Sequence, residues 1–281
     1  MKIAYLGPDG SFTSLATKEI FPNECLLPCR TISECFTAVS EAKAEKAVIP
    51  LENSIEGTVT MTLDELYNHE DLFIKCELVM PIAHHLMVHP QHDTFEKIYS
   101  HPQALAQTFR FREKHYPLVP TQEFSSTSAS AQRVAQHPDE PWAAIANAHA
   151  AKLYGLKILH ENIQDMEQNH TKFIVIGKKK NRLTLPLKNT GEKTSLLVTL
   201  PDDRSGGLHQ VLSVFAWRKM NLSKIESRTL KTGLGNYFFF INVATPWHPV
   251  LSENALQELR ALGASVKFLG HYDEYLITSP L

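Results

Sequence analysis

The stretch PLENSIEGTV, residues 50–59, places Glu52, Asn53, Ser54 and Thr58 between a short apolar run and an apolar helical pattern. Amide and hydroxyl side chains at such a junction can cap the following helix. They can also bind an anion, because the first N–H groups of a helix have no partner within it and carry partial positive charge. For this segment alone, capping is the simpler interpretation, and a binding site needs further segments of the same kind.

Three more polar segments occur where an apolar run gives way to a helical pattern. They are GPDGSFTS at 7–14, SHPQALAQ at 100–107 and SSTSAS at 125–130. Open α/β sheets bind ligands beyond the carboxyl ends of their strands. We therefore expect the four segments to line one polar cleft that suits an anion.

A fifth polar segment, DMEQNHTKFIVIG at 165–177, runs directly into a strand pattern that begins with Thr171 and Lys172. A hydroxyl beside an ammonium group can hold a carboxylate. An exposed lysine that guards the edge of a sheet is the alternative interpretation, and the spacing does not decide between them.

Neither a cofactor nor a metal ion is indicated. The chain has no GxGxxG and no Walker sequence, which disfavours a nucleotide. Five of its 14 histidines fall between His84 and His101, but their spacing is not that of a metal-binding motif.

The overall composition excludes several classes of protein. The 281 residues carry 28 basic and 30 acidic side chains, and this balance gives no footprint for nucleic acid or an anionic membrane. No apolar run approaches the roughly 20 residues of a membrane span, and the N-terminus lacks the apolar core of a signal peptide. Four cysteines without a CxxC pair fit a reducing compartment, so we expect a cytoplasmic protein.

The order of the apolar patterns predicts an α/β fold with a separate C-terminal domain. Short strand-like runs alternate with helical patterns, which favours a parallel sheet. The alternation breaks at Pro81 and then restarts, so we expect two lobes. The segment 179–193 has no periodicity and reads as a linker. Beyond it the order is βαββαβ, the ferredoxin-like arrangement.

Eight stretches together resemble the prephenate dehydratase family over nearly the full length of the chain. They are IAYLGPDGSFT, PLENSIEGTV, YSHPQALAQ, STSAS, LYGLKIL, NHTKF, GGLHQVL and KIESR. The resemblance implies a two-lobed catalytic domain, similar to a periplasmic binding protein, followed by an ACT regulatory domain. The implied ranges are 1–178 for the catalytic domain (lobe one about 1–78 and 160–178, lobe two about 79–159), 179–193 for the linker and 194–281 for the ACT domain.

The activity implied is that of a lyase of L-phenylalanine biosynthesis, which converts prephenate into phenylpyruvate. Loss of carbon dioxide and the ring hydroxyl makes the ring aromatic, so the reaction needs no cofactor and no metal. The enzyme must stabilise negative charge on the departing hydroxyl and hold the substrate in the geometry for fragmentation. The implied partners are prephenate, L-phenylalanine as effector, and further copies of the chain in a homodimer or homotetramer.

The same resemblance assigns residues to the two sites. The implied catalytic residues are Thr171, Asn53, Ser100 and Gln107. Those implied to bind substrate are Ser54, Gly57, Thr58, Ser126, Thr127, Lys172 and Phe173. Those implied to bind the effector are Gly206, Gly207, Leu208, His209, Glu226, Ser227 and Arg228.

Three positions depart from the family pattern. The usual Gly-Ala-Leu of the regulatory domain reads Gly206-Gly207-Leu208, where glycine in place of alanine keeps a small residue. The usual Thr-Arg-Phe reads Thr171-Lys172-Phe173, and lysine offers a single charge contact in place of the planar fork of arginine. The usual proline after Glu-Ser-Arg is Thr229, which frees the backbone torsion there.

Two other functions stay open at this point. The cleft could take arogenate, in which an amine replaces the keto group of prephenate. A non-catalytic amino-acid sensor of the same architecture is the second alternative, although Thr171 and Asn53 argue against it. The sequence does not give the sign or strength of the effector response.

Overall fold

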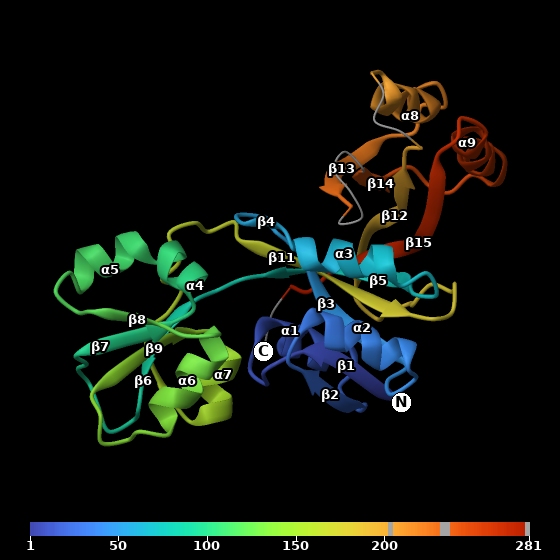
Figure 1. Cartoon of the computed structure of the whole chain (residues 1–281). Coiled ribbons are helices and arrows are strands. Elements are labelled where there is room, and N and C mark those ends of the chain that lie inside the picture. The colour runs from blue at the N-terminus through green and yellow to red at the C-terminus, as the bar shows by residue number, and fades with distance from the viewer. Residues whose placement is uncertain (202–204, 231–236, 279–281) are drawn as a thin grey trace.

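The computed structural model describes residues 1–201, 205–230 and 237–278, which form two lobes and a C-terminal region (Figure 1). One sheet runs through lobe one and the C-terminal region in the order β13-β14-β12-β15-β5-β11-β3-β1-β2, with β4 paired to β3. A second sheet, in lobe two, has the order β10-β6-β9-β7-β8. No helix in this part of the chain is long and apolar enough to cross a membrane.

Lobe one is an α/β unit with a mixed sheet. Its strands are β1 (Lys2–Leu6), β2 (Cys25–Cys29), β3 (Lys46–Asn53), β4 (Gly57–Thr58), β5 (Phe73–Pro81) and β11 (His170–Gly177), and its helices are α1 (Phe12–Ile20), α2 (Ile32–Ser40) and α3 (Thr60–Asn68). Strand β1 is parallel to β2 and β3, as predicted, but β11 is antiparallel to both β3 and β5. The prediction of a parallel sheet is wrong there, because β11 returns from lobe two in the opposite direction.

Lobe two repeats the α/β pattern on a smaller scale. Its strands are β6 (His85–Val88), β7 (Lys97–Ser100), β8 (Thr121–Glu123), β9 (Trp142–Ala146) and β10 (Lys157–His160), and its helices are α4 (Pro102–Gln107), α5 (Phe109–His115), α6 (Thr127–Ala135) and α7 (Ala148–Tyr154). Strand β7 is parallel to β8 and β9, whereas β6 is antiparallel to β9 and β10. Two extended segments, 82–84 and 161–169, connect the lobes (Figure 1).

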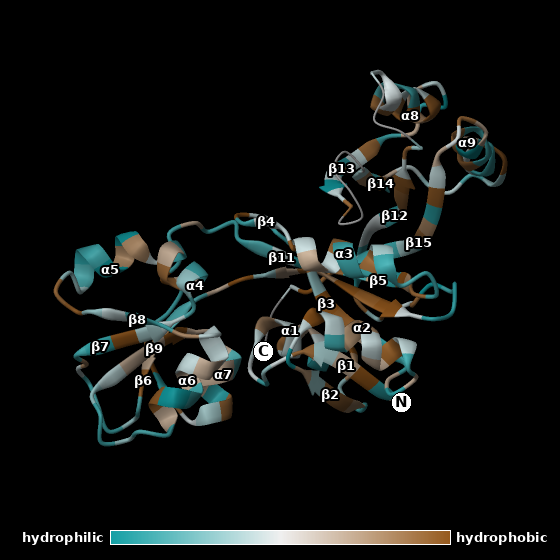
Figure 2. Ribbon diagram, viewed as in Figure 1, coloured by the Kyte–Doolittle hydropathy of each residue, from teal (hydrophilic) through white to brown (hydrophobic). Residues whose placement is uncertain are grey.

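The C-terminal region has the predicted βαββαβ order. Its elements are β12 (Lys188–Thr199), α8 (Gly207–Ala216), β13 (Leu222–Thr229), β14 (Tyr237–Val243), α9 (Pro249–Ala261) and β15 (Ser265–Leu276). Alternate residues of β14 serve two cores: Phe239 packs with α8 and α9, while Phe238 and Phe240 pack with lobe one. The ring of Phe238 stacks on Tyr67 of α3, with 4.9 Å between centroids. Hydrophobic residues accordingly concentrate on the strands and inner helix faces (Figure 2).

The C-terminal region is joined to lobe one more closely than a linker implies. Strand β12 begins at Lys188, inside the range predicted as linker, because it pairs with the second half of β15. That half of β15 also pairs in parallel with β5 of lobe one, from Asp273 opposite Cys76 to Leu276 opposite Val79. Close approach depends on Gly270, since a β-carbon there would collide with the carbonyl oxygen of Ile74.

Candidate active site

A cleft of about 970 Å³ lies between the lobes and is lined by residues of both. The four polar segments expected to line one cleft all contribute to it, through Asp9 and Ser11, Asn53 and Thr58, His101 and Gln107, and Ser126 and Thr127. The fifth segment, whose role the spacing left open, contributes Thr171 and Phe173. They meet because the carboxyl ends of β1, β3 and β7 face the same gap, and β11 starts beside the end of β3.

The contact with Asn53 determines the direction in which the Thr171 hydroxyl donates its hydrogen bond. The two residues are opposite each other on β3 and β11, and Asn53 Nδ2 donates to Thr171 Oγ1 at 2.9 Å. Asn53 Oδ1 accepts the backbone N–H groups of Ile55 and Glu56, at 3.0 and 3.2 Å. The amide therefore turns its nitrogen, which can only donate, toward Thr171. Because Thr171 Oγ1 accepts this bond, its own proton is free to donate to a group in the cleft.

Three more side chains extend this hydrogen-bonded chain into lobe two. Asn53 Nδ2 donates to Asn169 Oδ1 at 2.9 Å, and Asn169 Nδ2 donates to Gln107 Oε1 at 2.9 Å. His84 Nε2 lies 3.1 Å from the same Gln107 oxygen, so it carries the proton and donates. We call Thr171, Asn53, Asn169, Gln107 and His84 the amide chain. It spans both lobes and both connecting segments.

The amide chain is buried and uncharged. Its five members are each at most 9% exposed. Burial lowers the pKa of His84 to about 4, so the imidazole is neutral near pH 7. Gln107 Nε2 and His84 Nδ1 have no hydrogen-bond partner among the described residues. A buried donor and acceptor of this kind are costly, and sites that serve a reaction retain them.

Charged side chains supply the electrostatics of the cleft. Its lining includes Asp9, Arg30 and Glu56, and Asp9 is paired with Lys18 at 2.7 Å. Arg30, which follows β2, is the one lysine or arginine among the lining residues of the described chain. The start of α6 adds backbone N–H groups behind Ser126, whose Oγ accepts from Ala129 N at 3.0 Å. An anionic substrate fits this combination of a guanidinium group and a helix N-terminus.

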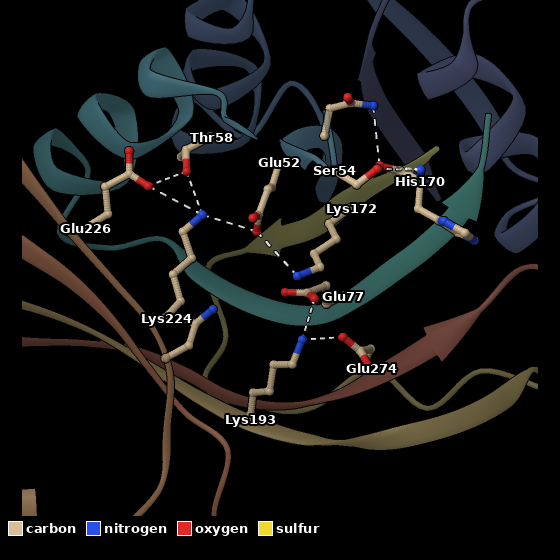
Figure 3. A network of polar contacts seen from close by, with 12 residues as sticks. Glu52, Ser54, Thr58, Glu77, His170, Lys172, Lys193, Lys224, Glu226 and Glu274 are labelled. Carbon is tan, nitrogen blue, oxygen red and sulfur yellow. Dashed lines mark hydrogen bonds and ion pairs between the residues drawn. The ribbon is translucent and has the colours of Figure 1, made fainter. Parts of the chain in front are cut away.

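Three residues predicted for the site do not line the cleft. Ser100 is fully buried in lobe two, where its hydroxyl donates to Ile145 O at 2.7 Å. Ser54 Oγ accepts from His170 N at 3.0 Å and so joins the end of β3 to the start of β11 (Figure 3). Lys172 points to the other face of the sheet, where its Nζ lies 3.3 Å from Glu52 Oε2. The remaining predicted residues of the catalytic and substrate sets do line it: Asn53, Gly57, Thr58, Gln107, Ser126, Thr127, Thr171 and Phe173.

Arg30, His84 and Asn169 were missed from the sequence. Arg30 had a usable signal, since it stands between a strand-like run and a helical pattern, as the other cleft segments do. His84 and Asn169 lie in the connecting segments, which have no periodicity that would give their direction. No group of three or more metal-binding side chains occurs among the described residues.

The residues implied for the effector lie on two elements of the C-terminal region. Gly206 adopts a left-handed conformation with φ of 83° and precedes α8, which begins with Gly207, Leu208 and His209. Glu226, Ser227 and Arg228 lie on β13, at the edge of the sheet. Arg228 forms an ion pair with Asp64 of α3: its Nη2 donates to Oδ1 and Oδ2 at 2.9 and 3.0 Å, and its Nε donates to Oδ1 at 3.2 Å.

Comparison with known proteins identifies relatives over nearly the full length of the chain. The family model described as "Prephenate dehydratase" matches residues 3–181. A prephenate dehydratase of Lactococcus lactis subsp. lactis is 45% identical over 276 residues, with 98% of each chain covered. The chain belongs to the prephenate dehydratase family. The solved prephenate dehydratase of Arthrobacter aurescens, in complex with L-Phe, is 33% identical to this chain with a TM-score of 0.84. The match covers 97% of this chain and 89% of that protein.

One solved relative of this prephenate dehydratase family member is named for a different activity. It is the quorum quenching acylase GqqA, which is 29% identical with a TM-score of 0.83 over 98% of both chains. The architecture is therefore shared by proteins named for different activities, and the activity has to be argued from the cleft.

Proposed function

We propose that the chain converts prephenate to phenylpyruvate in L-phenylalanine biosynthesis. The bond between the ring and its carboxylate breaks, and carbon dioxide leaves. The electron pair of that bond completes the aromatic ring and expels the ring hydroxyl, which takes up a proton and leaves as water. The observation that carries the proposal is the Asn53–Thr171 bond, because it makes Thr171 a hydrogen-bond donor toward the cleft.

Thr171 acts by stabilising charge. A threonine hydroxyl is a poor acid near pH 7, but a fixed donor in a site that excludes water stabilises negative charge strongly. The amide chain holds that donor in place before the substrate binds, since each side chain in it is fixed by its neighbours. Its neutrality matters as well, because it contains no carboxylate that would oppose the charge of the departing hydroxyl.

Arg30 and the start of α6 supply the positive potential for the two carboxylates of the substrate. Arg30 is on the lobe-one side of the cleft, and Ser126 and Thr127 are on the lobe-two side. A dianion bound between them draws the lobes together, which excludes water and strengthens the remaining polar contacts. Lys172 has no part in this grip, because its ammonium group is held by Glu52 on the other face of the sheet.

The domain division is also part of the proposal. Residues 1–178 form the catalytic domain, with lobe one at about 1–78 and 160–178 and lobe two at about 79–159. Residues 179–193 connect it to an ACT regulatory domain at 194–281. The βαββαβ order supports the ACT assignment, and the complex of the Arthrobacter aurescens relative with L-Phe supports L-phenylalanine as effector. The effector would be bound by the implied residues on α8 and β13, in a cytoplasmic homodimer or homotetramer.

A coupled assay tests the function and separates its alternatives. The protein is incubated with prephenate near neutral pH, and phenylpyruvate is read by its absorbance in alkali, with a protein-free sample to correct for spontaneous conversion. Arogenate is tested in parallel, with phenylalanine as the product. Turnover of prephenate with the larger kcat/KM supports the proposal. Preference for arogenate supports the alternative dehydratase, and no turnover of either supports a sensor.

The regulatory assignment is tested in the same assay. L-Phenylalanine changes the rate if it binds one conformation better than the other. Calorimetric titration that detects no L-phenylalanine binding at millimolar concentration would end this part of the proposal and leave the catalytic part untouched.

A further inference from the structure

A lysine of the C-terminal region reaches the loop that lines the cleft. Lys224 on β13 places its Nζ 3.1 Å from Glu52 Oε2, 2.5 Å from Thr58 Oγ1 and 3.4 Å from Glu226 Oε2. Thr58 in turn donates to Glu226. Figure 3 shows the Lys224 ammonium group at the centre of these three oxygens. Its side chain is only 14% exposed, so the contacts are largely shielded from water.

The two residues that Lys224 holds in lobe one frame the tip of a hairpin. Strands β3 and β4 form it, with Glu52 opposite Thr58 and Asn53 opposite Gly57. Successive side chains of a strand point to opposite faces. Glu52 therefore faces the C-terminal region, and Asn53 faces the cleft. Thr58, the cleft-lining residue opposite Glu52, is bound by the same ammonium group. Fixing Glu52 and Thr58 consequently fixes Asn53, which lies next to Glu52 on β3.

The charges at this junction are balanced. Glu52 and Glu226 meet Lys224, and Glu52 also meets Lys172. Burial alone would raise the pKa of Glu52, but Lys172 and Lys224 hold it below its usual value, so Glu52 is ionised. Without Lys224, the carboxylates of Glu52 and Glu226 would be left at a shielded junction where Lys172 is the remaining ammonium group of this set. The hairpin would then move to bring its carboxylate to water, because an unpaired charge is costly where water is excluded.

We propose that Lys224 is a positioning residue for the active site, which acts from the C-terminal region by fixing the β3–β4 hairpin and through it Asn53. The catalytic geometry of lobe one is then incomplete without β13. A displacement of β13 releases the hairpin and lowers activity. The kinetic part of this inference rests on the proposed function, and its structural part does not.

A matched pair of variants tests the proposal. Lys224→Met removes the ammonium group and keeps the length of the side chain. Lys267→Met is the control, since Lys267 also joins the C-terminal region to lobe one, through the carbonyl oxygens of Leu66, Tyr67 and His69, but contacts no residue of the hairpin. We expect Lys224→Met to lower kcat by about tenfold or more, with a smaller change in KM, because it misplaces a catalytic group. Lys267→Met should retain kcat within about twofold.

Hydrogen exchange gives a readout that does not depend on activity. The backbone N–H groups of Ile55 and Glu56 are bound by Asn53 Oδ1 within the hairpin. Their exchange should be faster in Lys224→Met than in Lys267→Met or the unmodified chain. If Lys224→Met does not fold, Lys224→Gln, which can still donate to Thr58, replaces it and should show the same changes to a smaller extent.

Two results would overturn the proposal. One is unchanged kcat together with unchanged exchange at the hairpin in Lys224→Met. The other is an equal loss in both variants, which would show that any weakening of the junction has the same effect. If the unmodified chain turns over no prephenate, the proposed function fails, and the exchange measurement alone decides the structural role of Lys224.

Discussion

Glu52 and Asn53 are neighbours on β3, yet they serve opposite sides of the molecule. Asn53 Nδ2 lies 2.9 Å from Thr171 Oγ1 in the cleft, while Glu52 Oε2 lies 3.1 Å from Lys224 Nζ of the C-terminal region. Because successive side chains of a strand point to opposite faces, the Asn53–Thr171 contact and the Glu52–Lys224 contact lie on opposite faces of β3. A shift of β3 that alters one contact alters the other.

Arg30 should govern substrate binding more than Lys172 does, although both are cations near the cleft. Arg30→Gln removes the guanidinium group from the cleft lining, so we expect KM for prephenate to rise about tenfold or more, the loss of one charge-assisted hydrogen bond. Lys172→Gln removes a charge from the opposite face and is the matched control. Steady-state kinetics of both variants check this. Equal effects on KM would contradict the assignment of Arg30.

Lys172→Arg should leave kcat/KM within about threefold of the unmodified enzyme. The ammonium group of Lys172 meets Glu52 on the face away from the cleft, and a guanidinium group can form the same ion pair. The measurement is kcat/KM for prephenate. A large loss would show that lysine is required at this position by the substrate or by the junction with Lys224.

Asn169→Ala should weaken both stability and catalysis. It removes two buried hydrogen bonds, to Asn53 Nδ2 and Gln107 Oε1, at a cost of about 0.5–1.5 kcal/mol each, and leaves Asn53 bonded to Thr171 and Gln107 bonded to His84 alone. We expect kcat to fall about tenfold or more, because Thr171 loses its fixed orientation.

The control for Asn169→Ala is Asn147→Ala. Asn147 is also buried and also joins the lobes, through a 2.9 Å bond to Gly10 O, but it lies outside the amide chain. Urea unfolding should show a loss of stability in both variants, and kinetics should show the large fall in kcat only for Asn169→Ala. Equal falls in kcat would mean that lobe stability alone explains the effect.

The fully buried Glu77 should make stability depend on pH. Its Oε1 lies 2.6 Å from Lys193 Nζ, and Lys193 also pairs with Glu274 at the contact of β5, β12 and β15 (Figure 3). Burial raises the pKa of Glu77 to about 7, against 4.5 for the ordinary side chain. Between these values the folded chain holds a proton that the unfolded chain has lost. The proton on Glu77 therefore stabilises the folded chain at low pH, and this stabilisation is lost as pH rises toward 7.

Glu77→Gln removes that dependence while keeping a neutral side chain of the same shape. The unfolding free energy of the variant minus that of the unmodified chain should increase from pH 5 to pH 8, by up to about 3 kcal/mol. Urea unfolding at several pH values measures it. Parallel pH profiles for the two proteins would contradict a raised pKa at Glu77.

Much of the cleft could be predicted because its segments follow strands. The stretches at 7–14, 50–59 and 125–130 meet where parallel strands end, which a sequence pattern reveals. Side-chain direction was harder: Ser100 stands at such a strand end, but its hydroxyl turns into the sheet to Ile145. With Thr171 placed in the cleft, the period of two already directs Lys172 to the other face.

Contacts between distant segments could not be predicted. Nothing local to β15 indicates that it pairs with β5, nearly 200 residues earlier, or that β11 enters the lobe-one sheet antiparallel to both its neighbours. The amide chain could not be predicted for the same reason. Asn53 meets Asn169 and Thr171 only after the polypeptide has formed lobe two and returned to lobe one. Such pairings depend on the whole fold and leave no periodic trace in the sequence.

The most direct test of the account is the kcat of Thr171→Val with prephenate, compared with that of Thr171→Ser. Valine keeps the shape of the side chain and removes the hydroxyl that Asn53 orients. We predict that Thr171→Val lowers kcat by about 100-fold or more, as loss of one oxyanion donor does, and that Thr171→Ser retains most of it. A Thr171→Val variant with the kcat of the unmodified enzyme would contradict the assignment of Thr171 as the donor to the departing hydroxyl.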